Sequence, residues 1–364
     1  MPALSIMIKP ASGLCNMKCK YCFYSDVVSH RKTGQYGVMS NDIADNLIQK
    51  AIAFANGDNI GIVFQGGEPL LAGIEYFKHF IDCVNSYNYK GKIYYSLQTN
   101  GTLIDDDWAE FFKANNFLLG VSLDGNEIHN KFRVMSDQSS SFEKIENGIK
   151  LLDKYKVDYN ILSVVTGYFA DNVEEIYNYF KSKGYKFLQF IPCLKPFGSN
   201  EESELFMTGK QYQNYLIKLF RLYANDFLND EYTSIRSFDN IVRLYGGVKP
   251  EQCGMIGACS RQFVVESNGN VYPCDFYCSD EWLLGNIKYC DFNILTKSER
   301  GLQFLKQSYE INDKCKKCEY FKYCRGGGCK REKESLDYCI AYKNFYKKSA
   351  VIFAKVLKKL RAGS

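Results

Sequence analysis

Three cysteines near the start of the chain constrain its fold and chemistry more than any other feature. Cys15, Cys19 and Cys22 follow directly after the first stretch of strand-forming residues. Three thiolates at this spacing can wrap one cubane iron–sulfur cluster, each binding a single iron. The next cysteine, Cys83, lies far along the chain on a helical pattern. We therefore expect the fourth iron to stay open for an exogenous ligand.

A zinc knuckle is the alternative for these three thiols. Zinc would need a fourth ligand, and the chain has only three histidines, of which His30 alone is a close neighbour in the sequence. We favour the iron–sulfur interpretation.

The bulk composition narrows the class of protein. The 364 residues are 46% hydrophobic and include fifteen cysteines. No apolar stretch reaches membrane-spanning length, and the first ten residues do not resemble a secretory signal, so we expect a cytoplasmic chain without a membrane partner. In that compartment, clustered thiols more often bind metal or take part in catalysis than form disulfides. The net charge of +5 is too small to indicate a nucleic-acid partner.

Short apolar runs alternate with amphipathic stretches in the first part of the chain. The predicted strands are Leu4–Lys9, Ile60–Gln65, Ile93–Gln98, Phe117–Leu123, Tyr159–Val165 and Phe187–Ile191. The predicted helices between them are 43–52, Ile74–Tyr87, Asp106–Ala114, Phe142–Tyr155 and Val173–Lys183. About six βα units in a row predict an α/β fold with a parallel sheet curled into a barrel or part of one.

The pattern changes after Pro196. A long helix is predicted around Gln211–Phe227, followed by a connector through Ser234–Val248. From Cys253 onward the chain is rich in cysteines and loops, with one hairpin turning at Ser267–Asn270. We place a boundary here, which gives predicted domains of residues 1–234 and 235–364.

Ten cysteines lie in the second predicted domain, and eight of them form the candidate ligand group. They are Cys253, Cys259, Cys274, Cys315, Cys318, Cys324, Cys329 and Cys339. Eight thiols can fully ligate two four-iron clusters. Two zinc sites with four thiolates each would fit this spacing equally well, and it is the motif at Cys15–Cys22 that favours iron–sulfur clusters. Cys278 could compete with Cys274 as a ligand.

A second motif, Gly66–Pro69, follows the second predicted strand. Glycines at this place let the backbone approach a ligand closely. Together with the cysteine motif it resembles the radical S-adenosylmethionine enzymes, whose cluster motif carries an aromatic residue at the position of Tyr21. The resemblance implies a partial (β/α)6 barrel followed by a cysteine-rich, loop-rich iron–sulfur domain, with S-adenosylmethionine as the ligand of the open iron.

The resemblance also implies the residues that hold this cofactor. Gly66, Gly67 and Glu68 would meet its amino group, and Tyr21 would pack beside the cluster. Three further contacts are expected at later strand ends, where ligands of parallel barrels gather. They are Ser122, Arg133 and Leu194.

The later cysteines resemble the twin-cluster SPASM extension of the same enzymes. The resemblance assigns one auxiliary [4Fe–4S] cluster to Cys253, Cys259, Cys274 and Cys329. It assigns the other to Cys315, Cys318, Cys324 and Cys339. The chain would then hold three [4Fe–4S] clusters.

Longer segments narrow the resemblance to one group. They are Ile8–Ser12, Tyr21–Tyr24, Phe64–Pro69, Ser96–Gly101, Gln262–Glu266, Tyr272–Tyr277 and Leu284–Ile287. Together they look like the anaerobic sulfatase-maturating enzymes. This implies oxidation of a Cys or Ser side chain, in a Cys/Ser-x-Pro-x-Arg motif of a sulfatase polypeptide, to Cα-formylglycine. Reduced flavodoxin or ferredoxin would donate the electron.

Asp275 is the predicted catalytic base, because it immediately follows Cys274 and matches the catalytic Asp of that group. Its alternative role is support of the neighbouring cluster ligand. Tyr24 and Gln65 flank the two cofactor motifs and are predicted to touch the substrate peptide, with packing as the alternative for each.

A maturase that crosslinks a ribosomally made peptide is the alternative function. Many such enzymes carry a peptide-binding domain before the barrel, and only 14 residues precede Cys15. We therefore expect direct recognition of a short motif.

Overall fold

The computed structural model describes residues 4–335 and 338–362. The chain forms two compact units that interleave along the sequence. The first unit comprises Met1–Ser122, Arg133–Tyr159 and Arg261–Lys306, and the second comprises Leu123–Phe132, Asn160–Ser260 and Gln307–Ser364. This division by packing differs from the predicted domains 1–234 and 235–364, whose boundary stays a prediction.

Four parallel strands form the centre of the first unit. They are β1 (Leu4–Lys9), β2 (Ile60–Phe64), β3 (Ile93–Thr99) and β4 (Leu118–Ser122), paired in the order of the sequence. The carboxyl ends of parallel strands meet at one edge of a sheet, and this edge is where the predicted cofactor motifs begin.

A β-meander completes the sheet of the first unit on the far side of β1. β8 (Phe263–Glu266) runs parallel to β1, and Lys9 and Glu266 are partners in this register. β9 (Asn270–Tyr272) and β10 (Gly285–Asn286) follow antiparallel. The hairpin at Ser267–Asn270 is confirmed, and it brings the Cys274–Asp275 segment to the carboxyl end of β1.

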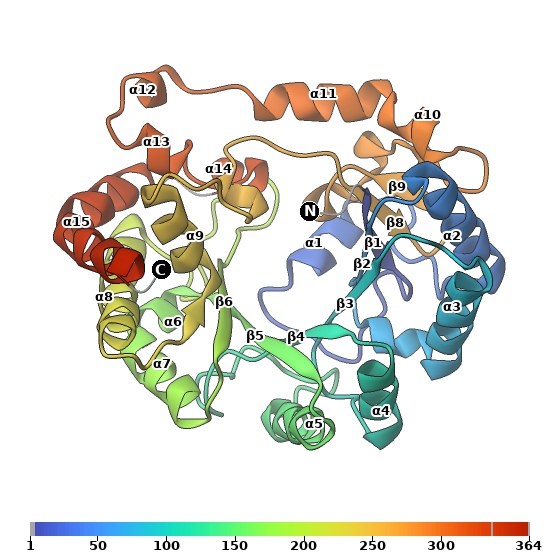
Figure 1. Ribbon diagram of the computed structural model, residues 1–364, viewed down its shortest axis with the longest axis horizontal. Helices are drawn as coiled ribbons and strands as arrows, with labels where there is room; N and C mark the ends of the chain where they lie inside the picture. Colours follow the sequence, from blue (N-terminus) through green and yellow to red (C-terminus); the bar gives the residue numbers. More distant parts are fainter. Residues whose placement is uncertain (1–3, 336–337, 363–364) are drawn as a thin grey trace. The chain divides into compact units, whose positions relative to one another are not determined.

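Helices cover the strands of the first unit. Figure 1 shows α2, α3 and α4 along one side of β1–β3. The helices are α1 (Phe23–Ser29), α2 (Asn41–Ala55), α3 (Ile74–Ser86), α4 (Asp106–Ala114), α5 (Phe142–Tyr155), α10 (Phe292–Thr296) and α11 (Glu299–Ser308), which extends past the unit's last residue. The core between helix and strand is aromatic, since the ring of Phe64 lies 4.9 Å from that of Phe77 and 5.1 Å from that of Phe80.

The second unit continues the alternation of strands and helices. β5 (Asp158–Val165) runs into it from the first unit, and β6 (Phe187–Pro192) and β7 (Ser234–Ile235) follow in parallel order. Its helices are α6 (Gly167–Asp171), α7 (Val173–Ser182), α8 (Gly209–Leu228), α9 (Arg236–Tyr245), α12 (Asp313–Lys316), α13 (Phe321–Cys324), α14 (Lys330–Ser335) and α15 (Cys339–Ala362).

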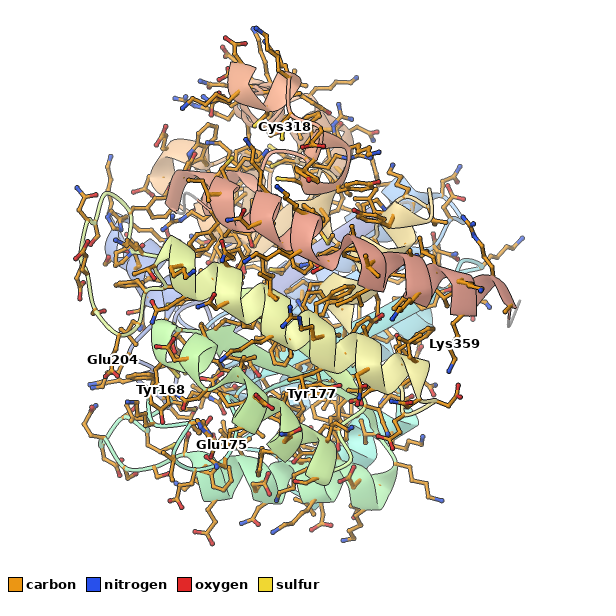
Figure 2. All side chains as sticks on the ribbon, turned by 90° about the vertical axis from the view of Figure 1, so that its left-hand side faces the viewer. Tyr168, Glu175, Tyr177, Glu204, Cys318 and Lys359 are labelled. Carbon is orange, nitrogen blue, oxygen red and sulfur yellow. The ribbon has the colours of Figure 1, made fainter. Side chains whose placement is uncertain are left out.

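The last helix, α15, packs along α8 (Figure 2). The rings of Phe220 and Phe353 lie 4.3 Å apart between them, and Lys359 donates a hydrogen bond of 2.9 Å to the carbonyl of Leu228. No helix within residues 4–335 and 338–362 combines the length and the apolarity that crossing a membrane requires.

The sequence predictions of local structure compare well with the structure. The predicted class, α/β with a parallel sheet, is confirmed, and each of the six predicted strands is present within a residue or two of its expected bounds. The connector expected at Ser234–Val248 was wrong, because β7 and α9 occupy most of it. Phe238, Ile241 and Val242 follow a helical spacing and are buried, so packing selects a helix here.

Candidate active site

The first three cysteines lie on the loop between β1 and α1. Cys22 is the residue that caps the start of α1, and its amide donates to the carbonyl of Cys19. Burial, Glu68 and the neighbouring thiols of Cys19 and Cys22 raise the pKa of the Cys15 thiol to about 12. Thiols gathered in this way need a nearby cation to be held as thiolates, and an iron–sulfur cluster supplies it.

The Gly66–Pro69 loop packs directly on the backbone that precedes Cys15. The amide of Gly67 donates to the carbonyl of Ser12 at 2.8 Å, and the amide of Glu68 donates to that of Leu14 at 2.7 Å. A Cβ atom added to Gly67 would lie 2.0 Å from the Leu14 carbonyl oxygen. Only glycine therefore permits this approach, which fixes the two predicted cofactor motifs against each other.

The carboxylate of Glu68 is fully buried and bound by the protein itself. It accepts hydrogen bonds from the amide of Leu70 at 3.1 Å, the hydroxyl of Thr99 at 2.9 Å and the amide of Asn100 at 2.8 Å. Burial outweighs these bonds and raises the pKa of Glu68 to about 7. In the structure Glu68 ties its loop to the carboxyl end of β3.

Two other predicted cofactor residues, Ser122 and Arg133, belong to the first unit. The guanidinium of Arg133 lies 5.5 Å from the ring centre of Tyr21, and both residues belong to this unit. Ser122 is buried at the end of β4 and accepts a hydrogen bond of 3.0 Å from Gln98. Leu194 belongs to the second unit, on the loop after β6. Its predicted role stays a prediction.

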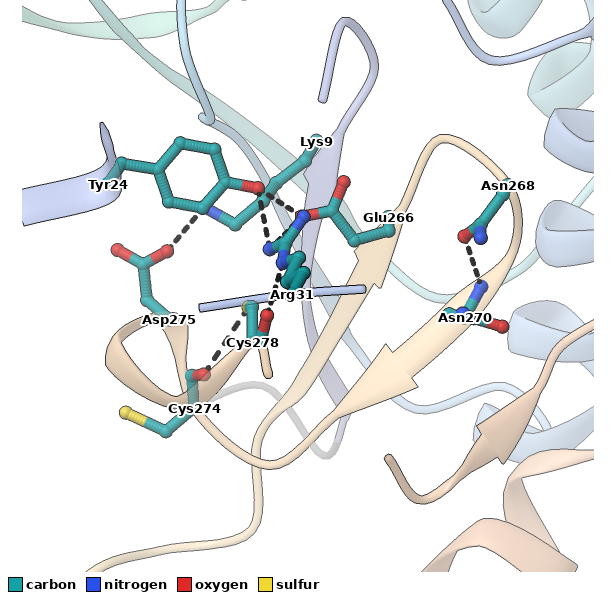
Figure 3. Close-up of polar contacts among 9 residues, drawn as sticks. All are labelled: Lys9, Tyr24, Arg31, Glu266, Asn268, Asn270, Cys274, Asp275 and Cys278. Carbon is teal, nitrogen blue, oxygen red and sulfur yellow. Dashed lines mark hydrogen bonds and ion pairs between the residues drawn. The ribbon is translucent and has the colours of Figure 1, made fainter. Parts of the chain in front are cut away.

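Asp275 lies in a buried ionic cluster, shown in Figure 3. It forms an ion pair with Lys9, whose ammonium group lies 3.8 Å from the ring centre of Tyr24. The Tyr24 hydroxyl in turn donates to Glu266, which is ion-paired with Arg31 at 2.7 Å. Burial alone would lower the pKa of Lys9, but the charge of Asp275 and its neighbours outweighs burial, so that the pKa is raised.

The two predicted substrate residues have different surroundings. Tyr24 is 2% exposed, and its hydroxyl is engaged by Glu266 and Arg31. Gln65 is half-buried, and its backbone N–H donates a hydrogen bond to the carbonyl of Ile8 near the end of β1. Both stay predictions as substrate contacts.

Cys278 belongs to the ionic cluster as well. It is completely buried, and its thiol lies 3.5 Å from the carbonyl oxygen of Cys274. Burial raises the pKa of this thiol, while Lys9 opposes the rise. The groups that surround its sulfur are thus the charged side chains of this cluster, which favours Cys274 over Cys278 as the ligand.

Four of the later cysteines line one pocket of the second unit. They are Cys315, Cys318, Cys324 and Cys339, the set assigned to one auxiliary cluster. Burial and the other three thiols raise the pKa of Cys324 to about 11. Lys314 and Lys343 also line this pocket.

Three cysteines of the other auxiliary set lie together in the second unit. Burial raises the pKa of the Cys329 thiol most, and Glu332 and Cys253 raise it further. Burial also raises the pKa of the Cys253 thiol, and Cys259 adds to that rise. Cys274, the fourth member, lies in the first unit, next to the η3 turn (Asp275–Tyr277).

The described thiols match the donors that [4Fe–4S] clusters require, since such clusters are held by cysteine thiolates. No disulfide joins the fifteen cysteines, all of which the structure describes. In the described part of the chain, no three His, Cys, Asp or Glu side chains are placed as ligands of a single metal ion.

Comparison with known proteins decides the family. Residues 10–181 match the radical SAM superfamily and residues 253–319 match an iron–sulfur cluster-binding domain. A cysteine-type anaerobic sulfatase-maturating enzyme of Clostridium perfringens (strain 13 / Type A) is 44% identical, over 95% of this chain and 96% of that protein. The chain belongs to the anaerobic sulfatase-maturating enzymes.

Two further similarities agree with this family. A serine-type anaerobic sulfatase-maturating enzyme of Bacteroides thetaiotaomicron is 30% identical, over 89% of this chain and 82% of that protein. The solved structure of native anSMEcpe with bound AdoMet and Cp18Cys peptide matches with a TM-score of 0.92 and 42% identity, over 98% of this chain and 99% of that one. The predicted family, fold and radical S-adenosylmethionine chemistry are confirmed, and the matched families imply [4Fe–4S] clusters.

The ionic cluster behind Asp275 was not predicted from the sequence. Lys9 and Glu266 were each part of a segment that carried the family resemblance, but neither was given a role. A signal was available in the sequence: Lys9 ends the largely apolar strand LSIMIK, and Glu266 ends the apolar strand FVVE.

Replacing Gly67 by Ala tests the close packing of the two cofactor loops. The added methyl group would collide with the backbone before Cys15, so we expect the variant to lose at least about tenfold in affinity for S-adenosylmethionine. Gly34→Ala is the control, because the nearest atom to its added Cβ lies at 3.7 Å. Binding is measured by calorimetry on the reconstituted proteins, and equal affinities would contradict the role of this contact.

Replacing Cys324 by Ser tests the ligand set of the pocket in the second unit. The variant should bind about one third less iron and sulfide than the native chain, because one of three clusters is lost. Cys278→Ser should bind as much iron as the native chain. Iron and sulfide are counted after anaerobic reconstitution, and a matching loss in the Cys278 variant would instead make Cys278 a ligand.

Proposed function

We propose that this chain oxidises the Cys side chain of a Cys-x-Pro-x-Arg motif in a sulfatase polypeptide to Cα-formylglycine. The observation that carries the proposal is the place of Asp275, which follows Cys274 in the unit that also holds the Cys15–Cys22 loop. The relatives support it, since they are named for maturing sulfatases and one of them is solved with a Cys-containing peptide.

The chain's own residues prepare this reaction. When bound, S-adenosylmethionine and the clusters supply a hydrogen-abstracting 5′-deoxyadenosyl radical and an acceptor for the second electron. Cys15, Cys19 and Cys22 would hold the first cluster, and the Gly66–Pro69 loop and Arg133 would orient the cofactor beside it. The eight later thiols would hold the auxiliary clusters.

Asp275 would act as the base. Oxidation of the thiol-bearing carbon removes one hydrogen atom from Cβ, one further electron and the thiol proton, and that proton needs an acceptor. The thioaldehyde that results then reacts with water, which supplies the aldehyde oxygen, and hydrogen sulfide leaves. The side chain of Asp275 keeps 11% of its surface accessible, whereas that of its partner Lys9 keeps none. Of the two, only Asp275 can receive a proton directly from a bound peptide.

The preferred target is cysteine rather than serine. The identity is 44% to the cysteine-type relative and 30% to the serine-type relative. As expected from the sequence, we also propose a cytoplasmic location and reduced flavodoxin or ferredoxin as electron donor, because oxygen-free, reducing surroundings preserve such clusters.

A peptide assay with an Asp275→Asn variant tests the function and the base together. The native chain, with S-adenosylmethionine and a reductant, should convert a Cys-x-Pro-x-Arg peptide to a product lighter by about 18 Da. Asp275→Asn should keep deoxyadenosine formation within about threefold but lose about 100-fold or more of the product, because a general base contributes at least this much.

Asp280→Asn is the matched control, since Asp280 lies on the next turn of the chain and is exposed. It should leave both readouts unchanged. If Asp275→Asn forms product at the native rate, Asp275 is not the base. If the native chain instead yields a crosslinked peptide that has not lost the mass expected for formylglycine, the proposed reaction is rejected.

A further inference from the structure

Lys9 occupies an unusual position for a lysine. It ends β1, a strand of the first unit that is otherwise largely apolar, and its side chain is completely inaccessible. Burying an ammonium group is costly unless the group is paired and well bound. The ammonium of Lys9 has two partners in the structure, the carboxylate of Asp275 and the ring of Tyr24.

The partners of Lys9 are held in turn by a second buried ion pair. The Tyr24 hydroxyl donates to Glu266, and Arg31 reaches both of them, at 3.1 Å to the hydroxyl oxygen and 2.7 Å to the carboxylate. Arg31 also donates to the carbonyl of Cys278. Figure 3 shows these groups as one continuous set.

The charges in this cluster balance. Two cations, Lys9 and Arg31, face two carboxylates, Asp275 and Glu266. Tyr24 joins the two pairs, since its ring lies under the Lys9 ammonium and its hydroxyl donates to Glu266. Buried ion pairs seldom add stability over apolar residues of the same size, whereas they do fix one geometry. This balance is therefore better explained by a need for defined positions than by a need for stability.

Asp275 is the group in this cluster whose position matters for the reaction. It lies on η3, a single turn of 3₁₀ helix. One turn of this kind has poor hydrogen-bond geometry and fixes a side chain weakly by itself. Contact with a side chain from the central sheet supplies the rigidity that the turn lacks.

Lys9 also adjoins the cofactor loop. A Cβ atom added to Gly66 would lie 3.4 Å from the Cβ of Lys9. One side chain thus extends from the loop that is expected to bind the cofactor to the carboxylate that is expected to take the proton. Its stem lies beside Gly66, and its charged head is paired with Asp275.

We propose that Lys9 is the positioning residue of the reaction: its buried ammonium, steadied by Tyr24 and the Arg31–Glu266 pair, holds the Asp275 carboxylate at a fixed place relative to the cofactor loop. The inference rests on the proposed role of Asp275 as base. Lys9 itself touches neither cofactor nor peptide, because its side chain has no accessible surface.

A double-mutant cycle tests this role. Lys9→Met removes the charge and keeps most of the volume, so cofactor cleavage should continue while the formylglycine formed per deoxyadenosine falls about tenfold or more. Because Lys9 acts only through Asp275, adding Lys9→Met to Asp275→Asn should lower that ratio by no more than about twofold. Independent, multiplying effects of the two substitutions would overturn the proposal.

Lys50→Met is the matched control for loss of a packed lysine. The Lys50 ammonium binds backbone carbonyls of the same unit, at Ile287 and Cys290, and no carboxylate of the cluster. This variant should be less stable yet form the native amount of product per deoxyadenosine. A fall in the ratio equal to that of Lys9→Met would show a merely structural effect and overturn the proposal.

Stability of the anaerobically reconstituted chain gives a readout that does not depend on activity. Each single variant leaves one buried charge unpaired, so Lys9→Met and Asp275→Asn should each lower the urea midpoint of unfolding. The double variant should lose less in midpoint than the two single losses added together. If Lys9→Met alone does not fold, recovery of a folded chain in the double variant supports the pairing. Failure of both to fold, or additive losses, overturns it.

The cycle also separates this inference from the proposed function. An Asp275→Asn variant with the native product ratio rejects Asp275 as base, whatever Lys9 does. If Asp275→Asn forms little product per deoxyadenosine while Lys9→Met forms the native amount, only the positioning role of Lys9 is rejected.

Discussion

The pairing of buried charges at the end of β1 is the interaction on which the rest of the site depends. Lys9 and Asp275 are separated by 266 residues in the sequence and meet inside the first unit. Glu266 and Arg31, 235 residues apart, meet beside them. These contacts join the segment after the first cluster loop to the segment that carries Cys274. The Cys15–Cys22 loop and the proposed base are thereby placed on one packed body.

A second constraint is purely steric. The Gly66–Pro69 loop and the backbone before Cys15 approach so closely that no side chain fits at Gly67. Two hydrogen bonds from this loop to Ser12 and Leu14 replace the side-chain packing that a larger residue would offer. Glu68 then links the same loop to β3. Three consecutive strands thus contribute their carboxyl ends to one connected frame at the proposed cofactor site.

Much of this could be predicted from the sequence because its signals are local. Strand and helix periodicity located the βα units. The resemblance to the twin-cluster extension divided the later thiols into two sets, one of which lines a single pocket. Long-range pairing could not be predicted in the same way. That β8 would lie parallel to β1 depends on the packing of segments about 250 residues apart, and no local pattern encodes it.

The ionic cluster shows the same limit at the level of single residues. Lys9 looks like the polar end of a strand, and Glu266 looks like the start of a hairpin. Only the register of β1 with β8 makes them neighbours. Helix α9 was missed for a different reason: it is only 10 residues long, and its apolar residues are interrupted by charged ones.

The central claim is that the radical made beside the first cysteine loop removes hydrogen from the Cβ of a target cysteine. A Cys-x-Pro-x-Arg peptide deuterated at that carbon tests it most directly, with mass spectrometry of the deoxyadenosine that is released. The account predicts about one deuterium per deoxyadenosine formed together with product. Deoxyadenosine free of deuterium, alongside formylglycine product, would contradict it.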